Sequence, residues 1–227
     1  MKKIIGLQFL SFLTISLTYA QPKKSNATEE QITKNLEIAF EYIDNDSDSA
    51  NIYIQKAKDL AKKINQPLFE VKILETEGNY FGFVKNDYNN ATNLYLKAVQ
   101  LCEKHQLNYT KNLYHSLGVL FHLTDNYEKA KLYYTKAIPL EKKEKDSVLL
   151  ARSLANLASI NSTQENFKKA EELFLESLKY PSSFEIKRTT YANLGNLKIR
   201  EKKFNEALVY LKKVTVINPE TGEGPDE

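Results

Sequence analysis

The chain repeats one pattern of small and aromatic residues at a nearly constant period. The alanines Ala50, Ala91, Ala130, Ala170 and Ala207 lie 41, 39, 40 and 37 residues apart along the sequence. In the segments 112–137, 152–177 and 189–214, a second small residue stands 12 positions before the alanine. Such a period is typical of stacked repeats, each of which buries its apolar side against its neighbours. The sequence therefore predicts five structural units of one kind.

Each unit is predicted to be a pair of helices. Two stretches with helical spacing of apolar residues flank a short polar segment, such as TDN at 124–126 or QEN at 164–166. Small residues allow the backbones of two helices to approach closely, while Tyr127, Phe167 or Phe204 fills the space beside the turn. We assign this packing role to Ala91, Gly118, Ala130, Ala158, Ala170, Gly195 and Ala207.

The predicted units divide the chain into an all-α solenoid with short extensions. They are expected near 28–66, 67–106, 110–145, 147–181 and 183–219, between a linker at 21–27 and a flexible acidic tail at 220–227. Thr28 and Ser182 have the spacing of a capping box with an acidic or amide residue three positions later. Asp146 or Ser147 can cap the helix that follows them.

Residues 1–20 have the order of a secretory signal. Lys2 and Lys3 precede an apolar run from Ile4 to Leu17, and Thr18-Tyr19-Ala20 supplies the small-x-small ending that signal peptidase prefers. The apolar run is shorter than the roughly 20 residues that a membrane-spanning helix needs. We therefore expect cleavage near Ala20-Gln21, export to the periplasm or the medium, and no membrane span afterwards; a retained anchor is the less favoured alternative.

Charge and cysteine content narrow the classes of partner. Without Lys2 and Lys3, 30 basic residues face 29 acidic ones, and clusters such as EKKEKD mix both signs. A nucleic-acid binder needs a concentrated basic face, so we expect no nucleic-acid partner. Cys102 is the single cysteine and cannot form an internal disulfide, so packing must supply the stability.

The last unit resembles a tetratricopeptide repeat (TPR). The resemblance rests on Tyr191, Leu194-Gly195, Phe204, Ala207, Leu211 and Pro219, and the units around Gly118 and Ala158 match nearly as well. It extends over residues 28–219 and implies a right-handed superhelix of about five helix pairs, whose first helices line a concave groove for an extended peptide or a partner helix. The chain is also similar to the extracytoplasmic sensor regions of bacterial TPR kinases and regulators.

The resemblance also implies which residues line the groove. By matching positions, these are Thr76, Tyr80, Phe83, His115, Val119, His122, Arg152, Asn156, Ser159, Asn193, Asn196 and Arg200. The three asparagines stand where such repeats bond a ligand backbone, although a bond between neighbouring helices is an equal alternative. Ala155 and Ala192 replace the lysines of the carboxylate-clamp subtype, which argues against an acidic C-terminus as the ligand.

Metal and cofactor sites are weakly indicated. Asp44, Asp46 and Asp48 have the alternating spacing with which a calcium-binding loop begins. However, Ser49 stands at the position of the loop's glycine, and Gln55 stands at the position of its bidentate glutamate. Two further residues, His115 and His122, share a helix face but lack a third ligand. We therefore expect no metal and no cofactor.

Catalytic chemistry is also not indicated. Cys102 near His105 is interpreted as a half-buried inert thiol. The tripeptides beginning at Asp48 and Asp146 resemble O-glycosylation acceptors at Ser49 and Ser147, with N-capping as the favoured alternative.

The predicted function is a non-catalytic scaffold outside the cytoplasm that binds a protein or peptide in the groove. The alternative is the sensor region of a TPR-containing kinase or transcriptional regulator, cut before its membrane helix. The final helix, NEALVYLKKVTVINP at 205–219, is apolar on more than one face, so self-association through it is a further expectation.

Overall fold

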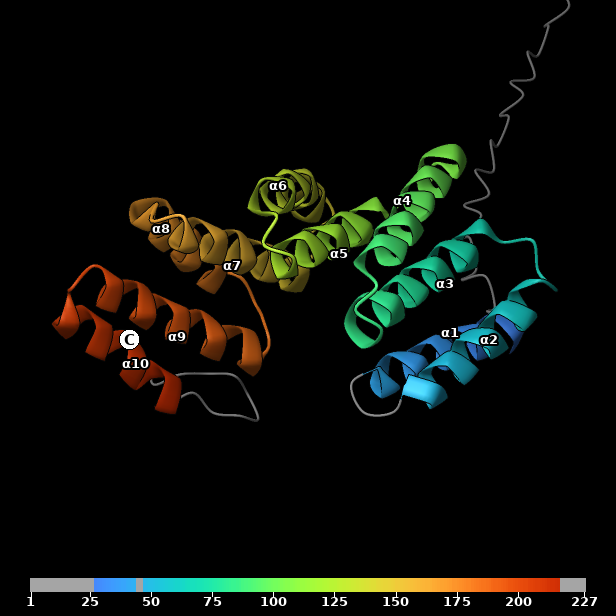
Figure 1. The fold of residues 1–227 in the computed structure, drawn as a ribbon, viewed down its shortest axis with the longest axis horizontal. Helices are drawn as coiled ribbons and strands as arrows, with labels where there is room; N and C mark the ends of the chain where they lie inside the picture. The colour runs from blue at the N-terminus through green and yellow to red at the C-terminus, as the bar shows by residue number, and fades with distance from the viewer. Residues whose placement is uncertain (1–26, 44–46, 217–227) are drawn as a thin grey trace, which may run out of the picture.

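The computed structural model describes residues 27–43 and 47–216, and in these residues the chain is helical without any strand (Figure 1). The prediction of an all-α fold of repeated helices is confirmed. The proposed signal, Asp44 and Asp46 of the acidic run, and the acidic tail lie outside the described residues. The segments are α1 (Ala27–Tyr42), α2 (Ser47–Ala61), α3 (Pro67–Asn79), η1 (Tyr80–Val84), α4 (Tyr88–His105), α5 (Thr110–Leu123), α6 (Tyr127–Lys143), α7 (Ser147–Thr163), α8 (Phe167–Leu178), α9 (Phe184–Arg200) and α10 (Phe204–Val216).

Consecutive helices form pairs, and the pairs stack into an arch. The α1–α2 and α9–α10 pairs lie at the two ends of this arch, and α6 lies at its crown (Figure 1). First helices of neighbouring pairs contact each other at three places, namely α1 with α3, α5 with α7, and α7 with α9. Second helices make no comparable contact with each other in the described residues. The first helices therefore form the inner side of the curve.

Close packing inside each pair depends on residues without a large side chain. A Cβ atom added at Gly118 would lie 2.7 Å from the ring of Tyr134, and one at Gly195 would lie 2.6 Å from Leu211. The ring or branched side chain of the second helix thus rests directly on the backbone of the first. The alanines that share this role are all buried: Ala91, Ala130, Ala158, Ala170 and Ala207.

Side-chain caps fix several helix starts. The Asp146 carboxylate accepts a bond from the backbone N–H of Leu149 at the start of α7, as predicted for this residue. At α9 the cap is Ser183 rather than the predicted Ser182, because Ser183 has the extended backbone that places its hydroxyl near the first turn. Helix α1 already includes Thr28, which therefore lies in its first turn.

A π-helical segment interrupts the regular geometry of the second unit. The backbone N–H of Lys85 donates to the Tyr80 oxygen at 3.2 Å, and that of Asp87 donates to Phe81 at 2.8 Å. These wide turns continue α3 by five residues, among which Phe83 is exposed. None of the helices in the described part of the chain combines the length and the apolar character that crossing a membrane requires.

Candidate functional site

The inner surface of α1, α3, α5, α7 and α9, which we call the groove, is the candidate site. The small residue in the middle of each first helix gives a common register, because it packs against the second helix of its own pair. Side chains at fixed offsets from it therefore occupy equivalent positions on α3, α5, α7 and α9. Three positions before the small residue stand Glu75, His115, Ala155 and Ala192, and one position after it stand Asn79, Val119, Ser159 and Asn196.

The structure distributes the predicted groove residues over a range of exposure. Phe83, Arg152, Asn196 and Arg200 are exposed, whereas Val119, His122, Asn156, Ser159 and Asn193 are partly buried. Thr76 is buried, and its hydroxyl donates to the Lys72 oxygen of its own helix.

Tyr80 belongs to the core and not to the groove. It is only 7 % exposed and packs among Ala39, Ile43 and Ile54 of the first helix pair. The reason is its register, because Tyr80 stands two positions after Gly78. Leu120, two positions after Gly118, occupies the corresponding place in the next unit and is also buried.

His115 is likewise withdrawn from the groove, because it is only 7 % exposed. Its Nδ1 atom lies 2.8 Å from Oγ of Ser153, and that hydroxyl donates to Oε1 of Glu141 at 2.7 Å. Burial, followed by the nearby charge of Arg152, lowers the pKa of His115 to about 3, so the ring is neutral. These hydrogen bonds between His115, Ser153 and Glu141 connect α5, α7 and α6 in the interior of the protein.

Two of the predicted ligand contacts instead connect neighbouring helices. The Asn193 amide donates to Oγ of Ser159 at 3.4 Å, and Nη1 of Arg200 donates to the Ser162 backbone oxygen at 2.5 Å. Both bonds join α9 to α7, which supports the interhelical alternative for Asn193. Arg152 of α7 and Asn196 of α9 are exposed and make no hydrogen bond to any described residue.

A pocket of about 380 Å³ lies at the α1 end of the groove. It is lined by Thr33, Leu36, Glu37, Phe40 and Glu41 of α1, by Lys72, Glu75 and Thr76 of α3, and by Tyr109 before α5. Its residues come from first helices and from the segment that leads into one, which places the pocket on the inner side of the arch.

Glu75 forms the polar floor of this groove pocket. Its carboxylate accepts bonds from the Tyr109 hydroxyl at 2.7 Å and the Ser116 hydroxyl at 3.1 Å, and burial raises its pKa. No basic side chain of the described residues lies within 4 Å of it. Glu75 is absent from the predicted groove set, although its register signals it: it precedes Gly78 by three positions, as His115 precedes Gly118.

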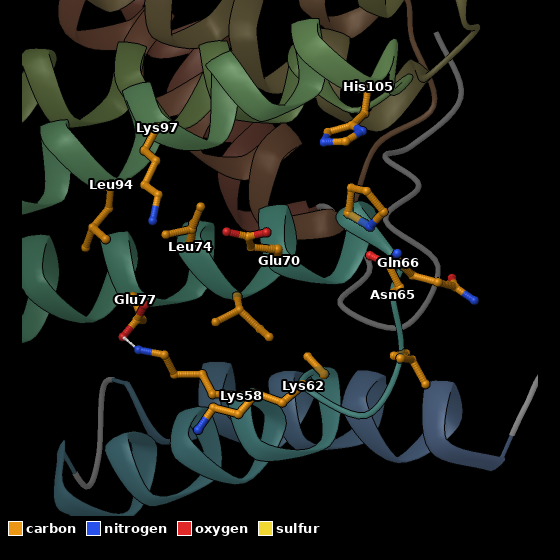
Figure 2. A pocket seen from close by; sticks show the side chains of 14 residues that line it. Lys58, Lys62, Asn65, Gln66, Glu70, Leu74, Glu77, Leu94, Lys97 and His105 are labelled. Carbon is orange, nitrogen blue, oxygen red and sulfur yellow. Dashed lines mark hydrogen bonds and ion pairs between the residues drawn. The ribbon is translucent and has the colours of Figure 1, made fainter.

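A second pocket, of about 600 Å³, lies on the outer side between α2, α3 and α4 (Figure 2). There the Lys58 ammonium pairs with Glu77 at 2.6 Å and ties α2 to α3. Glu70 and Lys97 extend into the same space from α3 and α4. The charges of both signs in this pocket give no single ligand chemistry.

The remaining candidate residues contribute to packing. Cys102 is buried, which raises the pKa of its thiol and leaves it inert. His122 packs edge-to-face on the ring of Tyr127, and burial lowers its pKa. Across 27–43 and 47–216, no three His, Cys, Asp or Glu side chains are grouped so as to hold a metal ion.

Comparison with known proteins agrees with this geometry. Residues 112–144 and 189–221 match one tetratricopeptide repeat family model, and residues 150–179 match another. These three segments are tetratricopeptide repeats. Helices α5 to α10, which span them, carry the repeated small residues at Gly118, Ala158 and Gly195. No curated protein matches the chain in sequence.

Several solved structures share the TPR fold. BtubC (BKLC) from P. vanneervenii superposes with a TM-score of 0.67 at 16 % identity, over 89 % of this chain and 96 % of that one. PilF of Pseudomonas aeruginosa gives 0.65 at 14 % identity, over 88 % and 80 % of the two chains. The apo form of the quorum sensor NprR from B. thuringiensis gives 0.64 at 14 % identity, over 82 % and 53 %. At these identities the likeness shows the fold alone.

Proposed function

We propose that this chain is a non-catalytic TPR scaffold that holds an extended peptide segment of a partner protein in the groove. The observation that carries the proposal is the groove pocket, an open cavity on the inner side of the arch with an exposed aromatic ring and a partly buried carboxylate. Preformed cavities that combine apolar walls with a few fixed polar groups are typical of binding sites.

The rest of the groove suits a peptide backbone. Arg152 of α7 and Asn196 of α9 are exposed and make no hydrogen bond to a described residue, and Asn156 of α7 is partly buried. Amide and guanidinium groups can bond the carbonyl oxygens of an extended chain whatever its sequence. A catalytic role finds less support, because Cys102 and His115 are both buried.

Selection from a displayed library of random nonapeptides tests this proposal on the full chain. Peptides that bind the groove should lose at least about tenfold in affinity when Arg152→Glu is combined with Asn156→Ala, because both changes remove groove donors. The control combines Lys143→Glu with Lys145→Ala at the exposed end of α6 and the turn after it, which removes one more unit of positive charge than the groove pair and should still leave binding unchanged. Equal loss with both pairs, or the absence of any selected peptide, would overturn the proposal.

Export is part of the same proposal and is supported by the order of residues 1–20. A basic start, an apolar run and a small-x-small ending direct a chain to the secretion pathway. N-terminal sequencing of the protein from a periplasmic fraction should begin at Gln21. A chain that keeps Lys2 and Lys3 and stays with the cytoplasmic fraction would contradict it.

The sensor alternative would use the same groove and add an output domain. No feature of residues 27–43 and 47–216 favours it over a scaffold, so the scaffold is the function that we propose. Apo NprR is a quorum sensor with this fold, but at 14 % identity that role is a property of NprR.

A further inference from the structure

The floor of the groove pocket is a carboxylate without a salt bridge in the described residues. Glu75 is held by two neutral donors, the hydroxyls of Tyr109 and Ser116, and no ammonium or guanidinium of residues 27–43 and 47–216 lies within 4 Å of it. Taking an ionised carboxylate out of water costs free energy unless a positive charge accompanies it. A ligand that brings a cation into the pocket would supply that missing charge.

The walls of the pocket suit the stem of a long basic side chain. Phe40 is 64 % exposed and has no packing role in the core, and Leu36 and Tyr109 complete an apolar and aromatic lining. Such a lining accepts the methylene groups of lysine or arginine, and its rings attract the cation at their end.

The charge around the pocket is also unbalanced toward acid. Glu37 of α1 joins Glu75, whereas Lys72 is the single basic residue that the described part of the chain contributes to the lining. The Lys72 ammonium lies about 6 Å from the centre of the Tyr109 ring; it forms no salt bridge with Glu75, although its charge lowers the pKa of that carboxyl and only partly offsets the effect of burial. A basic group therefore meets attraction both at the rim and at the floor.

We propose that the groove pocket receives a lysine or arginine side chain of the bound peptide. The inference rests on the proposed function, because it names the residue that anchors the same peptide. It gives Glu75 the role of the specificity-determining contact, held in position by Tyr109 and Ser116.

The peptide selection described above supplies the probe. Lysine or arginine should be enriched at one position of the peptides that the full chain retains, relative to the input library. Replacing that lysine by norleucine, or that arginine by citrulline, should weaken binding at least about tenfold, because it removes a charge-assisted bond in a water-poor site. The Glu75→Gln variant should bind the charged and the neutral peptide within about twofold of each other.

The same helix provides a matched control. Glu70 lies on the opposite face of α3, where it faces the outer pocket (Figure 2). Glu70→Gln should keep the full preference for the charged peptide. Circular dichroism must show that both variants are folded.

A second pair of variants tests the pocket if Glu75→Gln fails to fold. Phe40→Ala removes an exposed ring from the pocket wall and should weaken binding of the basic peptide about threefold to tenfold. Phe204→Ala on α10 removes a ring of the same 64 % exposure outside the groove and should have no effect.

The outcomes separate the two proposals. Peptides that respond to the Arg152 and Asn156 changes but show no basic enrichment, or that tolerate norleucine, would overturn the pocket assignment and leave groove binding intact. The same holds if Glu75→Gln keeps the preference for charge. Failure to select any peptide would overturn both proposals.

Discussion

At the scale of single residues, the helices in the middle of the solenoid are joined by a buried row of hydrogen-bonded polar side chains. His115, Ser153 and Glu141 connect three helices through bonds of 2.8 and 2.7 Å, and Oε2 of Glu141 has no hydrogen-bond partner among the described residues. Burial raises the pKa of Glu141 to about 7. The ionised form is therefore disfavoured in the folded protein, and Glu141 makes stability depend on pH.

The sign of this dependence follows from the direction of the shift. Glu141 imposes no cost below its ordinary pKa of 4.5, because it is then protonated in both states. As pH rises from 4.5 through 7, the unfolded chain ionises more readily, and about 3 kcal/mol of stability is lost. His115 acts in the opposite direction, because its lowered pKa costs stability as pH falls from 6.5 toward 3.

Comparison with Glu141→Gln isolates the carboxyl, because His115 is present in both proteins. Urea unfolding should show that the stability of the variant relative to the parent increases by about 3 kcal/mol between pH 4.5 and pH 8. A difference that stays constant across this range would contradict the burial of an ionisable Glu141.

At the scale of elements, each helix pair is locked by a contact between a small residue and a large one. We predict that Ala170→Leu or Gly195→Leu lowers the free energy of unfolding by about 1 to 3 kcal/mol, because the added atoms force the two helices apart. Thermal melting measures the change. The control Ala27→Leu, at the exposed start of α1, should melt like the parent. Unchanged melting of both core variants would show that these residues are not contact sites.

The last two pairs are joined by a buried cation. Lys198 of α9 is buried and lies 2.7 Å from Glu171, 3.1 Å from Glu201 and 3.2 Å from Glu206. Lys198→Met keeps most of the side-chain volume but leaves Glu171 and Glu206 without their cation, and should cost about 3 kcal/mol. Glu206→Ala removes an exposed partner and should cost less than about 1 kcal/mol. Equal effects of the two substitutions would contradict this account.

The period of the small residues was enough to predict the fold class, because only close-packed helix pairs require a glycine or alanine at the same place in each unit. Side-chain orientation was harder to predict. Tyr80 occupies a core position that Leu120 already indicates, so closer attention to register would have excluded it from the groove.

Other features of the site depend on three-dimensional contacts. His115 has a groove register, yet Ser153 of a neighbouring helix draws it inward, and sequence spacing does not reveal that bond. Glu75 has the same register and could have been found from it. Its lack of a salt bridge could not have been predicted from the sequence. Lys72 is only three residues away and would have been expected to pair with it.

At the scale of the whole molecule, α10 ends the described solenoid with apolar side chains facing water. Leu208 is 53 % exposed, and Phe204 and Val209 are exposed beside it. A terminal repeat normally has a polar outer face, because nothing stacks on it. Self-association through α10 therefore remains a prediction of this account.

Light scattering over a concentration series of the full chain tests it. The parent should show a rising apparent mass, and Leu208→Glu should give a monomer because it places a charge in the contact. Leu132→Glu on α6 is the control, with a leucine that is 51 % exposed and lies far along the chain from α10. A parent that stays monomeric at every concentration would contradict the prediction.

The central claim is that the groove of the first helices holds a peptide, and a crystal structure of the full chain with its tightest selected peptide tests it most directly. We predict an extended peptide along α3, α5 and α7, with a basic side chain beside Glu75. A peptide bound to the second helices, for example in the outer pocket between α2 and α4, would contradict the account.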